Sequence, residues 1–418
     1  MRNSATFFLE DLASFKKKAL QWAEQFSCFQ YLNGNGLAYH HGTFPCLLAV
    51  ANWASVVLKN RSSDTLDSLL QQGEWQFGYL GYEYANTYEY VPEEGFGLGE
   101  WFRPETILFF DEDQVRIESE SAPDEIFSHI STLEIGVPVH WHMIPVPAHS
   151  KESYVETIDN LKKHLLRGNI YQVNFCTRFV AEQAVLHPVQ VYEKLNTLSP
   201  TPFSALLKLG EKYIICASPE RYLKRMGAHV LSQPMKGTAP RGKNEEEDVE
   251  NALLLQRHPK ERAENIMIVD LVRNDLSKVC QAGSVHVSAL CEVRSFGAVH
   301  QMISTVEGLL PPEVTTEQLI QATFPMGSMT GAPKIRAMEL IREFEGHPRG
   351  PFSGTLGYVK PNGDFDLNVL IRSIFYNTKT KQLTYSVGSG VTVLSDAEKE
   401  YEECLLKAQA IAQILNGS

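Results

Sequence analysis

The chain has 418 residues and a formal net charge of −12, from 38 lysines and arginines against 50 aspartates and glutamates. A chain of this length can bury a large core and has room for about two or three domains. The negative charge argues against nucleic acid or an anionic membrane as the main partner, because either would require a basic surface.

The sequence predicts a cytoplasmic protein without a membrane span. Its first residues mix acidic and polar side chains into a short apolar run, which is wrong for a secretory signal. The longest apolar stretch, Cys46 to Leu58, is interrupted by polar residues and falls short of the roughly 20 residues that a span needs. Seven cysteines without a C-x-x-C pair or metal-ligand spacing predict free thiols in a reducing compartment.

The first third of the chain is predicted to be mostly β structure. Residues 1–145 carry short alternating runs separated by Gly, Asn and Pro. The aromatic run from Trp75 to Tyr84 is typical of a buried strand, although it could also stack a ligand. The stretch from Gly136 to Ala148 is interpreted as a crossing between an N-terminal β-rich region, 1–148, and a catalytic region, 149–418.

A helix and a strand are predicted after this crossing. Ser153 and Glu156 are spaced as a capping box, and apolar residues follow at helical spacing until Gly168. Residues 170–180 then alternate as a strand, with Gln172 on its polar face.

A lysine and a glutamate are predicted to face each other in the middle of the chain. Lys236 lies between a proline, which fixes φ, and Gly237, which permits a tight turn, so its ammonium is held by a stiff backbone. The preceding residues alternate like two strands joined by a turn at Gly227. Folding this hairpin places Glu220 opposite Met235 or Lys236, within a residue or two of register. A solvated surface lysine is the alternative interpretation.

Two pairs of glutamates lie on predicted helices. Glu261 and Glu264 share a face of the helix predicted from Lys260 to Asp275, and Glu400 and Glu403 form a second pair near the end of the chain. Solvated acidic faces are the simple interpretation. Beside an anionic ligand, however, two such faces would require a hard cation between them, and Mg²⁺ suits carboxylate and ligand oxygens.

Several residues in the last quarter of the chain are suited to binding an anion. Arg372 lies in an apolar strand predicted from Asp366 to Tyr376, where an arginine needs an anionic partner, either a structural carboxylate or a ligand. In a predicted loop, Gly388 and Gly390 would let backbone N–H groups approach a carboxylate. Lys407 follows one helical turn beyond the second acidic pair.

These residues belong to a longer ordered pattern. The chain from about Ser153 to Leu415 resembles the chorismate-utilising enzyme family through six segments, which are in order SPER, PMKGTAPRG, RAENIMIVDLVRND, FPMGSMTGAPKIRAMELI, GYVKPNGDFDLNVLIRSIF and VGSGVTVLSDAEKEYEE. Members of this family form anthranilate, aminodeoxychorismate, isochorismate or salicylate. The resemblance implies an α+β fold like that of anthranilate synthase component I, with large antiparallel sheets in a layered core and helices outside. It also implies chorismate as the substrate.

The resemblance assigns roles to single residues. Glu264 and Glu403 match residues that hold Mg²⁺ in the family, with Glu261 and Glu400 close by. Arg372 matches an arginine that binds the enolpyruvyl carboxylate. The remaining expected substrate contacts are Gly237, Thr238, Gly388, Ser389, Gly390 and Lys407.

Two positions depart from what relatives have. Isochorismate- and salicylate-forming relatives have a lysine where this chain has Gln172, and that lysine activates the attacking water. A tyrosine that contacts the substrate in relatives is replaced by Phe352, so one hydrogen bond to the substrate is expected to be missing.

Lys236 favours one branch of the family. Relatives that form anthranilate or isochorismate usually have alanine at this position, whereas those that form aminodeoxychorismate, for para-aminobenzoate and folate synthesis, have lysine. By analogy, Glu220 protonates the departing C4 hydroxyl while neutral Lys236 attacks C2, and ammonia then enters at C4 as the lysine leaves. Two alternatives stay open, an anthranilate-forming enzyme and a non-catalytic chorismate-binding scaffold subunit.

The ammonia is expected to come from another chain. A glutamine-hydrolysing domain of the expected kind carries its nucleophilic cysteine in a G-x-C-x-G elbow, and no cysteine here lies in that setting. The sequence therefore predicts a separate glutaminase subunit as the partner, with chorismate and ammonia as the small-molecule ligands.

Overall fold

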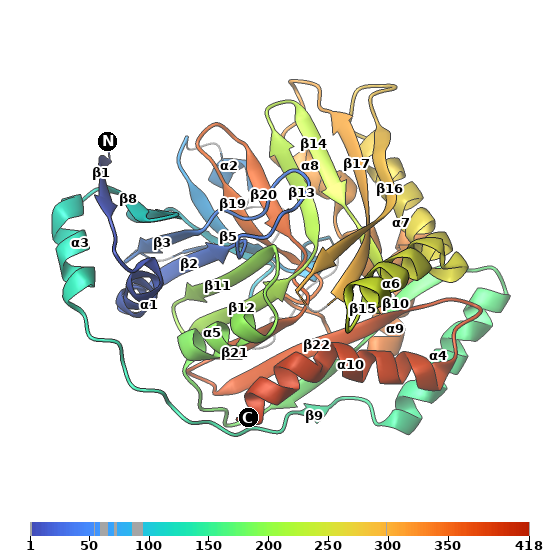
Figure 1. Ribbon diagram of the computed structural model, residues 1–418. Helices are drawn as coiled ribbons and strands as arrows, with labels where there is room; N and C mark the ends of the chain where they lie inside the picture. Colours follow the sequence, from blue (N-terminus) through green and yellow to red (C-terminus); the bar gives the residue numbers. More distant parts are fainter. Residues whose placement is uncertain are drawn as a thin grey trace.

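The computed structural model describes residues 2–53, 55–58, 66–70, 73–85, 95–297 and 299–417. In this part of the chain the strands form two antiparallel sheets, of 12 and 10 strands. Helices cover the outside of both sheets (Figure 1). This arrangement confirms the expected α+β fold with large antiparallel sheets in a layered core.

The order of the strands shows how each sheet is assembled. The first sheet runs β1 (Asn3–Phe8), β8 (Gln114–Ser119), β7 (Thr106–Asp111), β3 (Leu47–Ala51), β2 (Cys28–Asn33), β11 (Phe203–Leu209), β12 (Lys212–Ser218), β21 (Ser373–Asn377), β22 (Gln382–Val391), β10 (Gln172–Ala181) and β18 (Gly331–Ala332), with β9 (Val146–Pro147) paired to β10. The second sheet runs β15 (Met235–Pro240), β17 (Val299–Leu309), β14 (His229–Gln233), β13 (Arg221–Met226), β20 (Phe365–Asn368), β19 (Thr355–Val359), β5 (Gln76–Leu80), β6 (Gly99–Phe102) and β4 (Val56–Leu58), with β16 (His286–Phe296) paired to β17.

The helices lie between and after these strands in the chain. They are α1 (Leu12–Ala23), α2 (Leu66–Leu70), α3 (Pro123–Thr132), α4 (Lys151–Leu166), α5 (Pro188–Leu198), α6 (Glu245–Arg257), α7 (Pro259–Ser277), α8 (Thr316–Thr323), α9 (Lys334–Glu345) and α10 (Ala397–Leu415), with short 3₁₀ turns at Tyr82–Ala85 and Gly327–Met329. Among the described residues, none of these helices combines the length and apolar character that a membrane crossing requires.

The layers follow from the alternation of side chains along the central strands. On β11, Leu206 packs into the core under the helices, whereas Ala205 and Leu207 pack into a second core between the two sheets. On β2, Phe29 and Tyr31 likewise face the helices. Because neighbouring residues of a strand point to opposite faces, strands that are apolar at every position can serve both cores.

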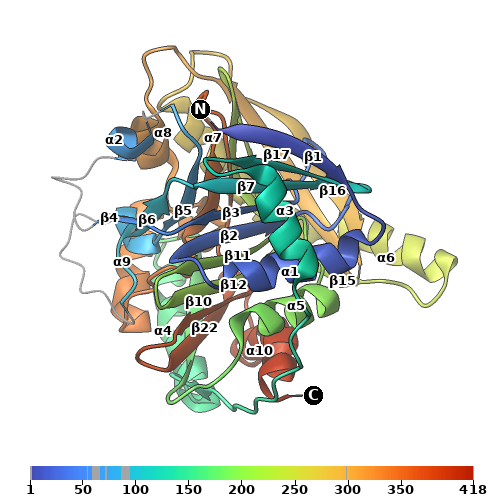
Figure 2. The same cartoon turned by 90° about the vertical axis from the view of Figure 1, so that its left-hand side faces the viewer.

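Each of the two sheets contains strands from both halves of the chain. In the first sheet β2 pairs with β11, and in the second sheet β5 pairs with β19. Figure 2 shows β3 and β2 continuing into β11 and β12. The boundary at residue 148 therefore stays a prediction about the sequence, since both sheets contain strands from either side of it.

The aromatic run is core, as the simpler interpretation predicted. Phe77, Tyr79, Tyr82 and Tyr84 are all buried.

Two local predictions differ from the structure. The first is the residue that caps the start of α4. Ser153 was predicted for this role, but the cap is Ser150, whose side chain accepts a hydrogen bond from the N–H of Ser153.

The second difference concerns the strand predicted from Asp366 to Tyr376. It is two strands, β20 in the second sheet and β21 in the first, and the chain turns between them. Arg372 lies at this turn with φ of 51°, in the left-handed region. The run of apolar residues gave no local sign of the turn, because both strands are buried.

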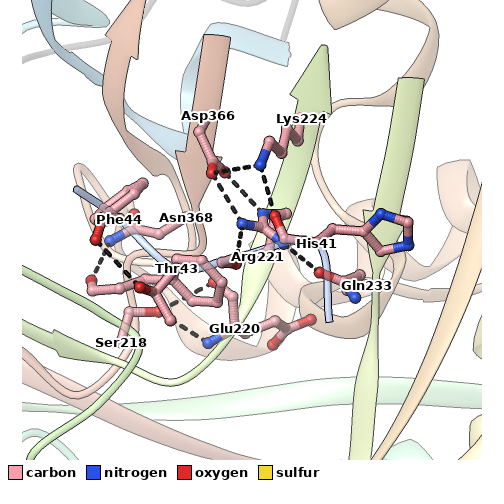
Figure 3. Close-up of polar contacts among 12 residues, drawn as sticks. His41, Thr43, Phe44, Ser218, Glu220, Arg221, Lys224, Gln233, Asp366 and Asn368 are labelled. Atoms are coloured by element: carbon pink, nitrogen blue, oxygen red, sulfur yellow. Dashed lines mark hydrogen bonds and ion pairs between the residues drawn. The ribbon is translucent and has the colours of Figure 1, made fainter. Parts of the chain in front are cut away.

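A buried ion pair joins the strands next to the candidate site. Arg221 of β13 donates from Nε and Nη2 to the two carboxylate oxygens of Asp366 on β20, at 2.8 and 2.9 Å, and from Nη1 to Gln233 on β14 (Figure 3). Both charged side chains are almost completely buried. The pair therefore fixes three strands to one another in a dry environment.

Replacing Asp366 with Ala should destabilise the protein by about 3–5 kcal/mol, because the arginine would be left buried without its counter-charge. Asp270→Ala is the control, since it breaks an exposed pair with Arg273 and should cost about 0–1 kcal/mol. Denaturant unfolding of both variants measures the difference. Equal losses of stability would show that the buried pair has no special role.

Candidate active site

Lys236 lies in a β-bulge that turns its side chain toward the end of β22. The register between β15 and β17 shifts between Met235 and Thr238, so the bulge contains Lys236 and Gly237. Gly237 has φ of 85°, which favours glycine. A bulge re-aims the side chains of the strand that carries it. The proline and the glycine on either side of Lys236 thus help to hold the backbone conformation that directs the lysine side chain toward β22.

Gly390 is the backbone surface against which this lysine lies. A Cβ atom added to Gly390 would lie 2.2 Å from Lys236 Nζ and 2.8 Å from Gln172 Nε2. A larger residue would therefore displace the ammonium or the amide. The glycine requirement at this position comes from close packing against two polar side chains.

Glu220 comes to the same site through the predicted hairpin. β13 and β14 pair with Arg221 opposite Gln233, and the turn has Gly227 in the left-handed region with φ of 61°. One residue further, Glu220 lies beside the chain that leads into Lys236. The hairpin and its approximate register are confirmed.

Burial gives Glu220 the properties of an acid near neutral pH. The residue is only 3% exposed. Burial raises the pKa of the Glu220 carboxyl to about 7, although nearby Ser328 and Met235 and the charges of Lys236 and Arg372 lower it. A carboxyl with this pKa can hold a proton and release it at the pH of the cell.

Arg372 presents an unpaired positive charge beside Glu220. Burial lowers the pKa of its guanidinium, and the charge of Glu220 raises it. Within the described residues this guanidinium makes neither a hydrogen bond nor an ion pair. Its left-handed backbone holds it at the turn between the two sheets. The arginine is therefore available to an anionic ligand.

The predicted loop with two glycines is part of a strand. Gly388, Ser389 and Gly390 lie within β22, where they pair with β10, while β21 pairs only with the earlier residues of β22. Lys407 of α10 donates to the carbonyl of Gly388 at 2.9 Å. Tyr154 lies 3.1 Å from Ser389 Oγ. No strand of the described residues lies along the other edge of this part of β22, so this edge still suits a ligand.

Gln301 is a positioning residue that the sequence did not reveal. It lies on β17, donates to the carbonyl of Gly237 at 2.6 Å and accepts from Thr238 Oγ1 at 3.1 Å. These bonds hold the bulge that carries Lys236. Ser328, near Glu220, was missed for the same reason, since each depends on pairing between distant segments.

Lys334 has a structural role. Its ammonium donates to Asp275 at the end of α7 and to the carbonyls of Thr323 and Pro325. These bonds fasten the segment that carries Ser328 to α7. Phe352, at the position where relatives have a tyrosine, is buried in the core between the sheets.

The four glutamates lie close to this lysine-rich site. Lys236 Nζ is 3.4 Å from Glu264 Oε2, and a Cβ atom added to Gly237 would lie 2.9 Å from Glu261 Oε2. Glu400 of α10 is buried as well. Helices α7 and α10 thus bring their acidic pairs to the same place.

The acidic cluster can hold a cation only together with water or a ligand. No three His, Cys, Asp or Glu side chains in the described ranges converge closely enough to bind a metal by themselves. Glu264, however, is 6% exposed, and its Oε1 is buried without a hydrogen-bond partner. Mg²⁺ keeps several waters and commonly uses one or two carboxylates. The donor set therefore fits Mg²⁺.

The comparisons identify the family to which this arrangement belongs. The model of the chorismate binding enzyme family matches residues 20–413, so the chain is a member of that family. It is 34% identical to aminodeoxychorismate synthase component 1 from Klebsiella aerogenes, over 80% of this chain and 75% of the relative. It is 38% identical to anthranilate synthase component 1 from Thermus thermophilus, over 64% of this chain and 56% of the relative.

Other relatives are much longer than this chain. It is 39% identical to the aminodeoxychorismate synthase from Streptomyces pristinaespiralis over 71% of its own length, but it spans only 40% of that protein. The crystal structure of anthranilate synthase component I from Streptococcus pneumoniae has the same fold, with a TM-score of 0.76 at 24% identity over 98% of this chain and 100% of that one.

The carboxyl of Glu220 should titrate near pH 7, and Arg372→Met should move this titration to higher pH. Removal of the positive charge takes away an interaction that favours the carboxylate. Infrared spectra recorded across the pH range measure the protonated carboxyl band. Glu220→Gln assigns the band, because Glu83 is also buried with its pKa raised to about 7. A band in the Arg372→Met protein that titrates at or below the original pH would contradict the assignment.

Proposed function

We propose that the chain is an aminodeoxychorismate synthase component I, which converts chorismate and ammonia to 4-amino-4-deoxychorismate. The observation that carries the proposal is the placement of Lys236. A bulge aims its amine at Gly390, beside an acid whose pKa is raised to about 7 by burial. A nucleophile and a proton donor at one site suit a substitution that proceeds through a covalent intermediate.

The proposed reaction has two substitutions. The amine of Lys236 bonds to C2 of the ring as the double bonds shift, and the C4–O bond breaks. Glu220 gives its proton to the leaving hydroxyl, which departs as water. Ammonia then bonds to C4, the double bonds shift back and the C2–N bond breaks. The proton lost by the new amine restores the acid, so the sum is chorismate plus ammonia giving aminodeoxychorismate plus water.

The substrate's two carboxylates have two places to bind. Arg372 offers an unpaired guanidinium to the enolpyruvyl carboxylate. The edge of β22 around Gly388 and Gly390 that no described strand covers, with Lys407 behind it, suits the other end of the molecule. Thr238 holds the bulge through Gln301. Binding by several fixed groups orients the ring between the amine and the acid.

Mg²⁺ is part of this proposal. Glu264 and Glu403 would hold it, with Glu261 and Glu400 beside them. When bound, the ion supplies positive charge that holds the ring carboxylate and stabilises the charge that develops there. The buried oxygen of Glu264 without a hydrogen-bond partner supports this assignment.

The rival product is anthranilate. Identity alone does not separate the branches, because the Thermus thermophilus relative named for anthranilate synthesis is as similar as those named for aminodeoxychorismate. Lys236 favours aminodeoxychorismate. A silent scaffold is disfavoured by the acid and the amine that lie close together at this site.

A separate glutaminase is proposed as the source of ammonia. The Klebsiella aerogenes relative is named as component 1, which supports an assembly with a second component. A cytoplasmic location is also proposed, and the seven free cysteines support it.

Lys236→Ala should lower the ammonia-dependent rate by on the order of a hundredfold or more, because covalent catalysis is lost. KM should change less than kcat, since Arg372 and the edge of β22 still bind chorismate. Coupled lyase assay measures aminodeoxychorismate, and fluorescence measures anthranilate, for wild type and variant side by side. A variant with full rate would refute the nucleophile, and anthranilate as the main wild-type product would refute the branch.

Glu403→Gln should lower the rate, and moderate Mg²⁺ should not restore it, because the variant loses a charge from the proposed ion site. Chelation of divalent ions should inactivate the wild-type protein reversibly. Glu398→Gln, on the exposed start of the same helix, is the matched control. Full wild-type activity in a chelator would remove Mg²⁺ from the mechanism.

A further inference from the structure

Lys260 lies in the middle of the acidic cluster. It stands at the start of α7, and its Nζ is 3.8 Å from Glu264 Oε1 on the same helix and 3.8 Å from Glu400 Oε1 on α10. The lysine therefore bridges the two helices that supply the four glutamates. It occupies the space between carboxylates on which the Mg²⁺ proposal depends.

All four glutamates act on this lysine. It lies 3.8 Å from one member of each pair and directly precedes Glu261 in the chain, and all four carboxylates attract its charge. Lys260 thus carries its positive charge among all the proposed ligands rather than beside one of them. Lys236 also contacts this cluster, 3.4 Å from Glu264 Oε2, but it comes from β15 rather than from one of the two helices.

The contacts of Lys260 are electrostatic only. Its ammonium forms no hydrogen bond within the described part of the chain, and 39% of its side-chain surface is exposed. Lys407, by comparison, donates to a carbonyl and lies 2.7 Å from Glu403 Oε1. A lysine held by charge alone, with a partly exposed side chain, can leave its place without breaking a hydrogen bond.

We propose that Lys260 is a resident counter-ion of the acidic cluster, which it occupies in the absence of Mg²⁺ and must leave when Mg²⁺ binds. The inference rests on the proposed Mg²⁺ site. Two cations between the same carboxylates repel each other strongly at a few ångströms.

The counter-ion has a consequence for metal affinity. Without the charge of Lys260 the carboxylates repel one another, so the metal-free variant should be less stable than the metal-free wild type. Mg²⁺ would then bind without displacing another cation, so its affinity should be higher. If Lys260 instead helped to bind the metal, its replacement would lower the affinity for Mg²⁺.

The test compares Mg²⁺ binding by the full chain and three variants in titration calorimetry. Lys260→Met removes the charge and keeps a good helix former. Its Kd for Mg²⁺ should be lower than that of the wild type by about tenfold. Lys260→Arg retains the charge and should not bind more tightly. Arg273→Met, which removes one charge from an exposed position late in the same helix, should match the wild type.

A second measurement follows the lysine itself. Acetylation of Lys260, read by mass spectrometry, should accelerate when Mg²⁺ is added, because the amine moves into solvent. In chelator, Lys260→Met should unfold at a lower temperature than Arg273→Met, and saturating Mg²⁺ should narrow that difference.

The outcomes separate the two proposals. Mg²⁺ binding to the wild type with an unchanged or weaker affinity in Lys260→Met would overturn the counter-ion role and leave the metal site standing. Mg²⁺ binding to none of the proteins, with and without chorismate, would overturn both. Unchanged acetylation on addition of Mg²⁺ would likewise contradict the displacement.

Discussion

The ion pair between Arg221 and Asp366 fixes strand β13, and Glu220 lies directly before that strand. Arg221 follows Glu220 directly in the chain, and its guanidinium bonds to β20 and β14 at once. Because both charges are buried, a shift of β13 by one residue would leave them unpaired at a cost of several kcal/mol. The position of Glu220 relative to Lys236 therefore depends on a contact that itself takes no part in the chemistry.

A protein with a net charge of −12 binds a dianion only if its positive charge is concentrated locally. The structure does this by placing Lys236, Arg372 and Lys407 around the end of β22. The glutamates of α7 and α10 balance the lysines while no ligand is present. Of these three side chains, only that of Arg372 has no hydrogen-bond or ion-pair partner among the described residues, which makes it the natural first contact for an incoming carboxylate.

The sequence predicted the features that depend on local spacing. The hairpin before Lys236 and the paired glutamates on α7 and α10 follow from periods of two and of three to four residues. The break at Arg372 was not predictable, because the strands on its two sides are equally apolar and belong to different sheets. Gln301 and Ser328 were missed because a lone polar residue shows its role only when distant segments meet.

The site also shows how one fold can serve several reactions. According to the family resemblance, isochorismate-forming relatives have their catalytic lysine at the position of Gln172 on β10, whereas this chain has its lysine on β15. The side chains of Gln172 and Lys236 both reach Gly390, so the two positions place their side chains at the same site from different strands. An amine that approaches from β10 can activate a water, while one aimed by the bulge of β15 can attack the ring. In the proposed mechanism, the strand that carries the lysine therefore selects the reaction, while the rest of the site can stay the same.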